Sequence, residues 1–122
     1  MPRILVVDDD IDILSVMEVL FSMKGFDVEV TAKGENTFPK INAFKPDLIL
    51  LDVLISGYDG RTICRQLKDD ENTRHIPIIM FSAHPGAAAA ISDYGADDFI
   101  AKPFDVAHLM KKVNAQLGIH NN

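Results

Sequence analysis

The sequence predicts an α/β domain built around a parallel sheet with helices on both faces. Two observations support this fold class. Short apolar segments alternate along the 122 residues with longer amphipathic ones, as expected when strands and helices follow one another. The apolar segments also contain uninterrupted runs, such as ILVV and LILL, which are typical of strands buried on both faces. No repeat, linker or change in composition divides residues 1–122, so one domain is expected.

The first part of the chain predicts a strand, a helix and a second strand. RILVV at 3–7 has the composition of a buried strand. Asp10 can cap a helix over 11–25, in which apolar residues recur every three or four positions and Gly25 supplies a stop signal. DVEVT at 27–31 alternates between polar and apolar residues, as a strand should.

The middle of the chain predicts two further pairs of helix and strand. The helix at 34–45 contains Pro39, which removes a backbone donor and costs on the order of 3 kcal/mol in a helix interior. A late start or a kink is therefore expected there. PDLILLD at 46–52 is an apolar strand that runs into an acid, the segment at 60–70 has a helical pattern, and PIIMFS at 77–82 is a buried strand.

The last part of the chain completes the alternation. AAAAISDYG at 87–95 predicts a short Ala-rich helix, DFIA at 98–101 a strand, and residues 106–118 an amphipathic helix. The expectation is five strands that alternate with five helices.

Composition excludes several function classes. The net charge is −6, with 12 Lys+Arg against 18 Asp+Glu and no basic run, so direct binding to nucleic acid or to an anionic membrane is not expected. The single cysteine, Cys64, excludes an internal disulfide. The N-terminus has too few apolar residues for a signal peptide, and no segment approaches membrane-span length. A soluble cytoplasmic domain is therefore expected.

Polar residues follow four of the predicted strands at their carboxyl ends. They are Asp8 and Asp9 after the first strand, Asp52 at the end of the third, Ser82 at the end of the fourth and Lys102 after the fifth. In an open parallel sheet, functional groups collect beyond these strand ends, where the strand order reverses. The sequence therefore predicts that these side chains form one site.

The residue types in this predicted site suit phosphoryl transfer. Three acids at close range need a cation, and oxygen ligands favour a hard ion such as Mg²⁺. A lysine opposite the acids can neutralise a phosphoryl group, and Asp52 could act as the nucleophile that forms an aspartyl phosphate. The Ser82 hydroxyl could then donate a hydrogen bond to a phosphoryl oxygen.

Four motifs, VVDDD, LILLD followed by DG, FSA and AKPF, together resemble the receiver domain of bacterial two-component response regulators. The resemblance covers essentially the whole chain, with the motifs in the right order on the right elements. It implies a flavodoxin-like fold, a doubly wound five-stranded sheet of order 2-1-3-4-5 with helices on both faces. A single receiver domain over residues 1–122, with no output domain, is expected, either as a stand-alone receiver or as a receiver cut from a longer protein.

The resemblance implies a role for each acid of the predicted site. Asp52 would be the phosphoacceptor. Asp8 and Asp9 would hold Mg²⁺, Asp9 more directly, and Asp52 and the backbone carbonyl of Leu54 would complete the protein ligands.

The remaining motif residues match the switch of the family. Ser82 matches its Ser/Thr position, and Ala83 is the small residue that gives the phosphoryl group room. Lys102 matches the family's lysine, with a cis bond to Pro103, and Phe99 matches the aromatic position that turns inward on activation.

Two further positions are expected to tune hydrolysis of the phosphoryl group. Leu54 and His84 match positions that flank the phosphorylation site. An apolar Leu54 should shield the acyl phosphate from water, whereas His84 could orient water or a partner's phosphate. Ile55 and Ser56 stand where the family often has Met-Pro. Slow hydrolysis is expected.

The implied function is a signalling switch and not an enzyme with a separate substrate. A sensor histidine kinase, a histidine phosphotransfer protein or a small acyl phosphate would supply the phosphoryl group. Output would pass through the face formed by the helix at 87–95, the strand at 98–101 and the helix at 106–118, by docking a partner or by dimerising.

Other functions on the same architecture fit the residues less well. A flavin binder needs a phosphate-cradling loop after the first strand, where this chain has three acids, and a dinucleotide fold needs an absent G-x-G-x-x-G. A phosphatase of the haloacid-dehalogenase type needs a second acid two residues after the nucleophile, where Leu54 stands. The alternative is a degenerate receiver that acts only as an interaction module, and the complete set of acids, hydroxyl and lysine counts against it.

Overall fold

The computed structural model describes residues 1–55, 57–83 and 91–119 of the chain. Five parallel strands form one sheet in the order β2-β1-β3-β6-β7. They are β1 (Arg3–Val7), β2 (Asp27–Thr31), β3 (Leu48–Asp52), β6 (Ile78–Ser82) and β7 (Asp98–Ala101). The remaining two, β4 (Leu54–Ile55) and β5 (Tyr58–Asp59), pair only with each other as an antiparallel hairpin. The sheet therefore has the predicted order 2-1-3-4-5.

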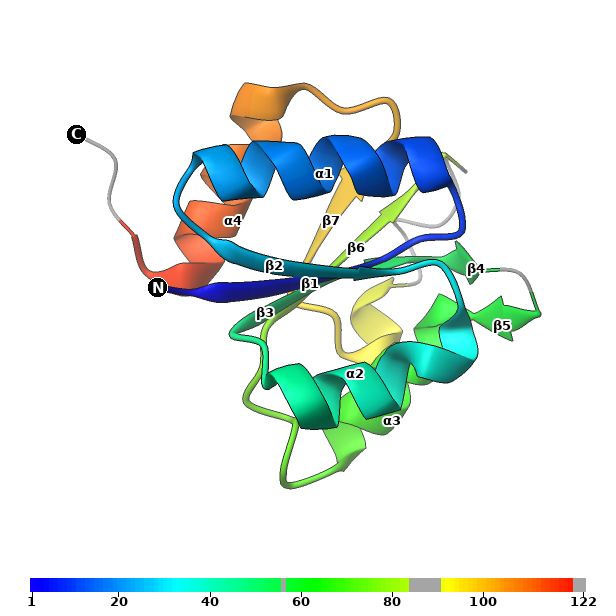
Figure 1. Cartoon of the computed structure of the whole chain (residues 1–122). Coiled ribbons are helices and arrows are strands. Elements are labelled where there is room, and N and C mark those ends of the chain that lie inside the picture. Colours follow the sequence, from blue (N-terminus) through cyan, green and yellow to red (C-terminus); the bar gives the residue numbers. More distant parts are fainter. Residues whose placement is uncertain (56, 84–90, 120–122) are drawn as a thin grey trace.

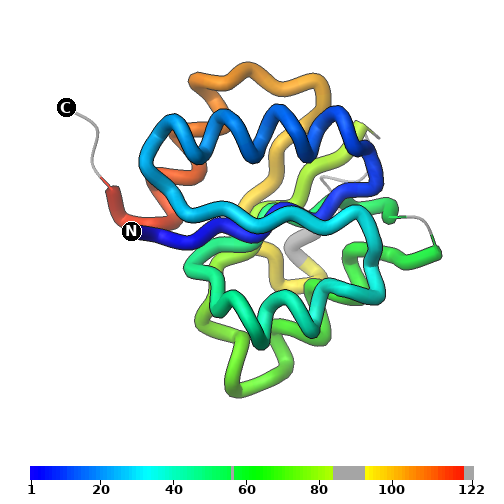
Figure 2. Tube along the Cα trace, in the orientation of Figure 1, coloured from blue at the N-terminus to red at the C-terminus, as the bar shows by residue number. Residues whose placement is uncertain are grey.

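Helices cover both faces of the sheet, as predicted. Figure 1 shows α1 (Ile11–Met23) and α4 (Val106–Leu117) on one face, and α2 (Thr37–Phe44) and α3 (Gly60–Asp69) on the other. The Cα trace in Figure 2 follows the same two layers. Alternate strand residues supply two separate cores, because side chains of a strand point to opposite faces in turn. In β1, for example, Leu5 and Val7 join the α2–α3 core, whereas Ile4 and Val6 join the α1–α4 core.

Local sequence signals account for where the first two helices begin. Asp10 caps α1, since its side chain accepts hydrogen bonds from the backbone N–H groups of Asp12 and Ile13. The late start expected from Pro39 is confirmed. A 3₁₀ turn, η1 (Gly34–Asn36), precedes α2, so Pro39 lies in the first helical turn, where backbone N–H groups have no acceptor within the helix.

Two features differ from the sequence-based expectation. The β4–β5 hairpin was not predicted, because strands of two residues are too short to carry an apolar pattern. Of the helix expected at 87–95, the structure describes a 3₁₀ turn, η3 (Ile91–Tyr94), and residues 84–90 lie outside the described ranges. The described ranges therefore contain four α-helices where five helices were expected. None of the helices in these ranges has the length and apolar character needed to cross a membrane.

Candidate functional site

The carboxyl ends of the central strands bring the predicted polar residues together. Parallel pairing aligns Val7 with Leu51, so Asp8 and Asp52 follow neighbouring positions in β1 and β3. Asp52 in turn aligns with Phe81, which places Ser82 one position further along β6. Lys102 directly follows β7, and its backbone N–H donates a 2.9 Å hydrogen bond to the carbonyl of Ser82. Residues far apart in the sequence therefore meet at one edge of the sheet.

Three carboxylates form the centre of this site. Asp8, Asp9 and Asp52 each offer an oxygen atom, and these oxygens all lie within 4.8 Å of one another. Asp8 is fully buried and Asp52 is 7% exposed, whereas Asp9 is open to solvent. An oxygen-only donor set of this kind fits a hard divalent cation such as Mg²⁺, with Asp9 facing the side from which an ion can enter.

Lys102 supplies the positive charge opposite the acids. Its Nζ lies 2.7 Å from Oδ2 of Asp8 and 3.2 Å from Oδ2 of Asp52, and it stands 4.7 Å from the centre of the Phe81 ring. The Lys102–Pro103 peptide bond is cis, the geometry that the resemblance led us to expect. Burial lowers the pKa of Lys102, but hydrogen bonds and charge attraction from Asp8 and Asp52 outweigh it, so the pKa is raised. The ammonium group is therefore charged at any physiological pH.

The same surroundings raise the pKa of the Asp52 carboxyl, whereas a carboxyl in an exposed ion pair usually has a lowered pKa. Burial, followed by the negative charge of Asp8, raises the pKa of Asp52 from 3.8 to about 6, although Lys102 opposes the rise. Asp52 is therefore still mostly ionised at neutral pH and can act as a nucleophile. The buried negative charge is held at a free-energy cost that a bound cation would relieve.

Backbone hydrogen bonds orient the two buried carboxylates. Oδ1 of Asp8 accepts a 2.9 Å bond from the N–H of Asp10, and Oδ1 of Asp52 accepts a 3.3 Å bond from the N–H of Leu54. Each carboxylate thus directs one oxygen to the backbone that follows it and the other to Lys102. This division explains why a single lysine can bridge both acids.

Gly60 is a site residue whose role sequence reasoning missed. Its N–H donates a 2.7 Å bond to the carbonyl of Val53, and a methyl group at this position would lie 1.9 Å from the carbonyl oxygen of Asp52. Only glycine leaves room for this approach. The available signal was its place in the DG motif, for which no role was predicted.

The remaining predicted residues take different positions. Ser82 is buried at the end of β6, and Ala83, which follows it, is exposed. Leu54 is 49% exposed, and Phe99 is half-buried against the α2–α3 core. His84 lies outside the described residues, so its predicted role stays a prediction.

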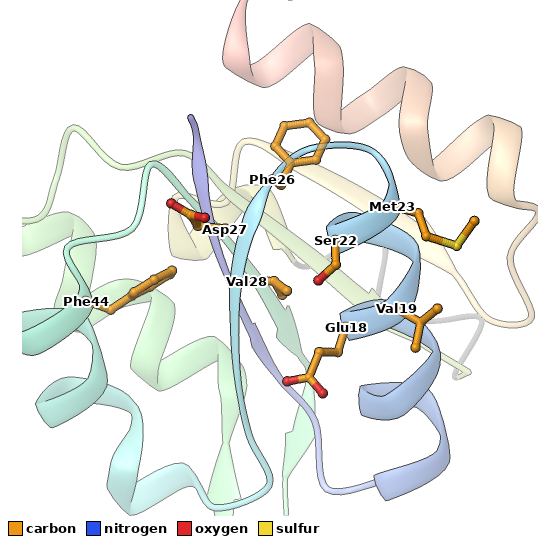
Figure 3. Close-up of a pocket in the computed structure, with 8 residues that line it drawn as sticks. All are labelled: Glu18, Val19, Ser22, Met23, Phe26, Asp27, Val28 and Phe44. Carbon is orange, nitrogen blue, oxygen red and sulfur yellow. The ribbon is translucent and has the colours of Figure 1, made fainter.

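A separate hollow of about 720 Å³ lies at the opposite end of the sheet. Figure 3 shows side chains from α1 and β2 around it, with Phe44 of α2 facing them. The pairing of Arg3 with Asp27 places this hollow beside the start of β1, whereas Asp8 follows the end of that strand. The hollow is therefore not part of the acidic site.

Comparisons with known proteins agree with this geometry. A family model described as the response regulator receiver domain matches residues 4–114. A DNA-binding dual master transcriptional regulator, RpaA of Synechocystis sp., is 39% identical over 119 residues, which cover 96% of this chain and 49% of the relative. The response regulator PleD of Caulobacter vibrioides is 38% identical over 115 residues, covering 93% of this chain and 25% of the relative. The chain thus spans from a quarter to about half of these relatives.

Solved structures show the same fold. A two-component response regulator from Clostridium difficile superposes with a TM-score of 0.88 at 27% identity, covering 100% of both chains. The BeF3-activated N-terminal receiver domain of RstA from Klebsiella pneumoniae superposes with a TM-score of 0.86 at 28% identity, covering 94% of this chain and 97% of the other.

Proposed function

Because the chain belongs to the family of response regulator receiver domains, we propose that it signals through reversible phosphorylation of Asp52. The observation that carries this proposal is the position of Lys102, whose ammonium group bridges Asp8 and Asp52 beside the cluster of three carboxylates. A lysine held between a nucleophile and a metal-binding acid can transfer its contact to an incoming phosphoryl oxygen.

The transfer step uses the ionised form of Asp52. A carboxylate oxygen forms the new O–P bond while the P–N bond of a phosphohistidine breaks, and the electron pair returns to the imidazole nitrogen. The donor is a sensor histidine kinase or a histidine phosphotransfer protein, or a small acyl phosphate in which a P–O bond breaks instead. Lys102 lies 3.2 Å from the acceptor carboxylate, so it can contact the phosphoryl group without a long movement.

Asp8, Asp9 and Asp52, together with the backbone carbonyl of Leu54, are the groups that would hold Mg²⁺. Asp9 is exposed and can be reached by an ion from solvent, whereas Asp8 is buried and fixed by the N–H of Asp10. When bound, Mg²⁺ supplies positive charge that neutralises phosphoryl oxygens in transfer. The buried position of Asp52 excludes bulk water from one side of the acyl phosphate.

Phosphorylation would switch the domain by drawing the Ser82 hydroxyl toward the phosphoryl group. Ser82 lies at the end of β6, where its hydroxyl can turn toward a phosphoryl group on Asp52, and the small Ala83 leaves room for that group. Movement of Ser82 frees space into which the half-buried Phe99 can rotate. The face that includes β7 and α4 would then change its packing and dock a partner or a second copy, as a shift between two populated states.

The lifetime of the acyl phosphate would depend on the residues around it. Leu54 follows Asp52 by two positions and is half exposed, so its apolar side chain can shield the group from water. His84 would be the second tuning position. Slow hydrolysis remains the expectation.

The partners of this chain are proteins. RpaA is named as a DNA-binding regulator, but this chain carries a net charge of −6 without a basic run and spans about half of that relative. The acidic charge of residues 1–122 therefore favours protein partners over direct contact with nucleic acid or membrane. A cytoplasmic location, typical of response regulators, is part of the proposal. It assists reactions at its own aspartate and is not assigned a separate substrate.

Intact mass spectrometry after incubation with acetyl phosphate tests the proposal. One added phosphoryl group is expected on the wild-type chain with Mg²⁺ present, and none is expected with EDTA or on Asp52→Asn. Asp69→Asn, which changes an exposed acid on α3, should be phosphorylated like the wild type. Equal labelling of Asp52→Asn and the wild type would show that another residue is the acceptor.

A further inference from the structure

The β4–β5 hairpin lies in the chain between Asp52, the proposed phosphoacceptor, and helix α3. It leaves the sheet directly after Asp52 and projects from the carboxyl edge, as Figure 1 shows. The pairs Leu54 with Asp59 and Ile55 with Tyr58 hold its two strands together. Since Leu54 also donates its N–H to Oδ1 of Asp52, the position of the hairpin bears directly on the acidic site.

The hairpin is anchored at its base and along its inner side. The N–H of Gly60 bonds the carbonyl of Val53, which ties the residue after β5 to the residue before β4. Ile55 is 3% exposed and belongs to the α2–α3 core. Both contacts lie inside the fold.

The remaining anchor is the contact between Tyr58 and Gly34, where the structure leaves no room for a side chain at residue 34. A methyl group at Gly34 would lie 2.6 Å from Cγ and Cδ2 of Tyr58 and 2.8 Å from its Cβ. Because Cβ takes part in the clash, rotation of the tyrosine side chain cannot fully relieve it, and the backbone of η1 or of the hairpin has to shift. Gly34 is not among the described glycines with positive φ, so it is needed for space and not for its backbone conformation.

Tyr58 is not buried as a core aromatic would be. Its side chain is 42% exposed and, with Phe38 of α2, lines a shallow groove of about 440 Å³. Because more than half of Tyr58 is nevertheless covered, Tyr58→Ala should also lower overall stability, and Mg²⁺ affinity has to be measured on the folded protein. Its contact with Gly34 acts on where the hairpin lies.

We propose that Tyr58 is a positioning residue for the metal site. By resting on Gly34 it sets the place of the β4–β5 hairpin, and thereby the direction of the Leu54 carbonyl. The inference rests on the proposed function, which makes that carbonyl a ligand of Mg²⁺. It extends the proposal from the acids at the strand ends to a contact between η1 and the hairpin.

Magnesium affinity, measured by titration calorimetry on the unphosphorylated chain, tests the inference. Gly34→Ala forces η1 and the hairpin apart and should weaken Mg²⁺ binding about tenfold, the usual effect of disturbing groups that orient metal ligands. Tyr58→Phe keeps the ring and should bind as the wild type does. Tyr58→Ala should weaken binding by a smaller factor than Gly34→Ala does.

The double variant separates the ring contact from other effects of the glycine. When Tyr58 is already alanine, the added methyl group at Gly34 meets Cβ of residue 58 but no ring, so Gly34→Ala should cost less Mg²⁺ affinity in the Tyr58→Ala background than in the wild type. Phe38→Ala is the matched control, because it removes a similarly exposed ring that lines the same groove from α2 and not from the hairpin strands. Its Mg²⁺ affinity should equal that of the wild type.

Different results would overturn the metal site and the positioning role of Tyr58. If Asp9→Ala and Asp52→Asn bind Mg²⁺ as the wild type does, the proposed metal site is wrong. If those variants lose affinity but Gly34→Ala and Tyr58→Ala do not, the positioning role of Tyr58 is overturned. The role is also overturned if Gly34→Ala costs as much affinity in the Tyr58→Ala background as in the wild type, since the loss would then not come from the ring.

Discussion

Replacing Asp52 by asparagine should make the metal-free protein more stable at neutral pH. The Asp52 carboxylate is nearly buried and shares its surroundings with that of Asp8. Burial and the charge of Asp8 raise the pKa of Asp52 from 3.8 to about 6, and Lys102 only partly compensates. Asparagine has almost the same shape and no charge, so the substitution removes the electrostatic penalty and keeps the packing.

The size and pH dependence of the gain follow from the pKa. A rise from 3.8 to about 6 corresponds to about 3 kcal/mol, since each pKa unit is worth ~1.36 kcal/mol. The folded state binds this proton more tightly than the unfolded chain does, so wild-type stability falls as the pH rises from about 4 to about 6. Above that window the contribution is constant. Below it Asp52 is protonated in both states, and the two proteins should be equally stable.

Urea unfolding of both proteins in EDTA, followed by circular dichroism across this pH range, measures the difference. The advantage of Asp52→Asn should grow with pH to about 3 kcal/mol, whereas Asp69→Asn, which changes an exposed acid, should stay within about 0.5 kcal/mol of the wild type. Added Mg²⁺ should stabilise the wild type more than Asp52→Asn and reduce the gap. A gap independent of pH, or a less stable Asp52→Asn at neutral pH, would refute the reasoning.

Three further predictions concern the same elements. Lys102→Met leaves Asp8 and Asp52 without their cation and should lower the free energy of unfolding in EDTA by about 3 kcal/mol, and unchanged urea midpoints would contradict this. Gly60→Ala sets a methyl group against the backbone oxygen of Asp52 and should destabilise by about 2 kcal/mol or more in the same assay, so wild-type stability would argue against the close approach. Burial raises the pKa of the Cys64 thiol to about 11, so iodoacetamide should modify the native protein about a hundredfold more slowly than the urea-unfolded chain, and equal rates would show that the thiol is accessible.

Several parts of the fold and the site were predictable because they depend on local patterns. Uninterrupted apolar runs marked the central strands, Asp10 marked the start of α1, and Pro39 marked the late start of α2. Parallel strands end at a common edge, so Asp8 and Asp52 could be expected to meet without knowledge of any distance. The family resemblance added the sheet order, which the apolar pattern alone does not contain.

The sequence by itself thus determined the five strands of the sheet, the four α-helices and which polar residues reach one edge of the sheet, but not the β4–β5 hairpin or the 3₁₀ turn η3. Only the tertiary structure decided how those residues interact. Two contacts join segments distant in the chain, the ion pair of Lys102 with Asp8 and the contact of Tyr58 with Gly34. The raised pKa of Asp52 likewise depends on burial and on the charge of the distant Asp8. Local propensity extends over a few neighbouring residues, whereas these features depend on the separation and burial that result when whole strands and helices pack.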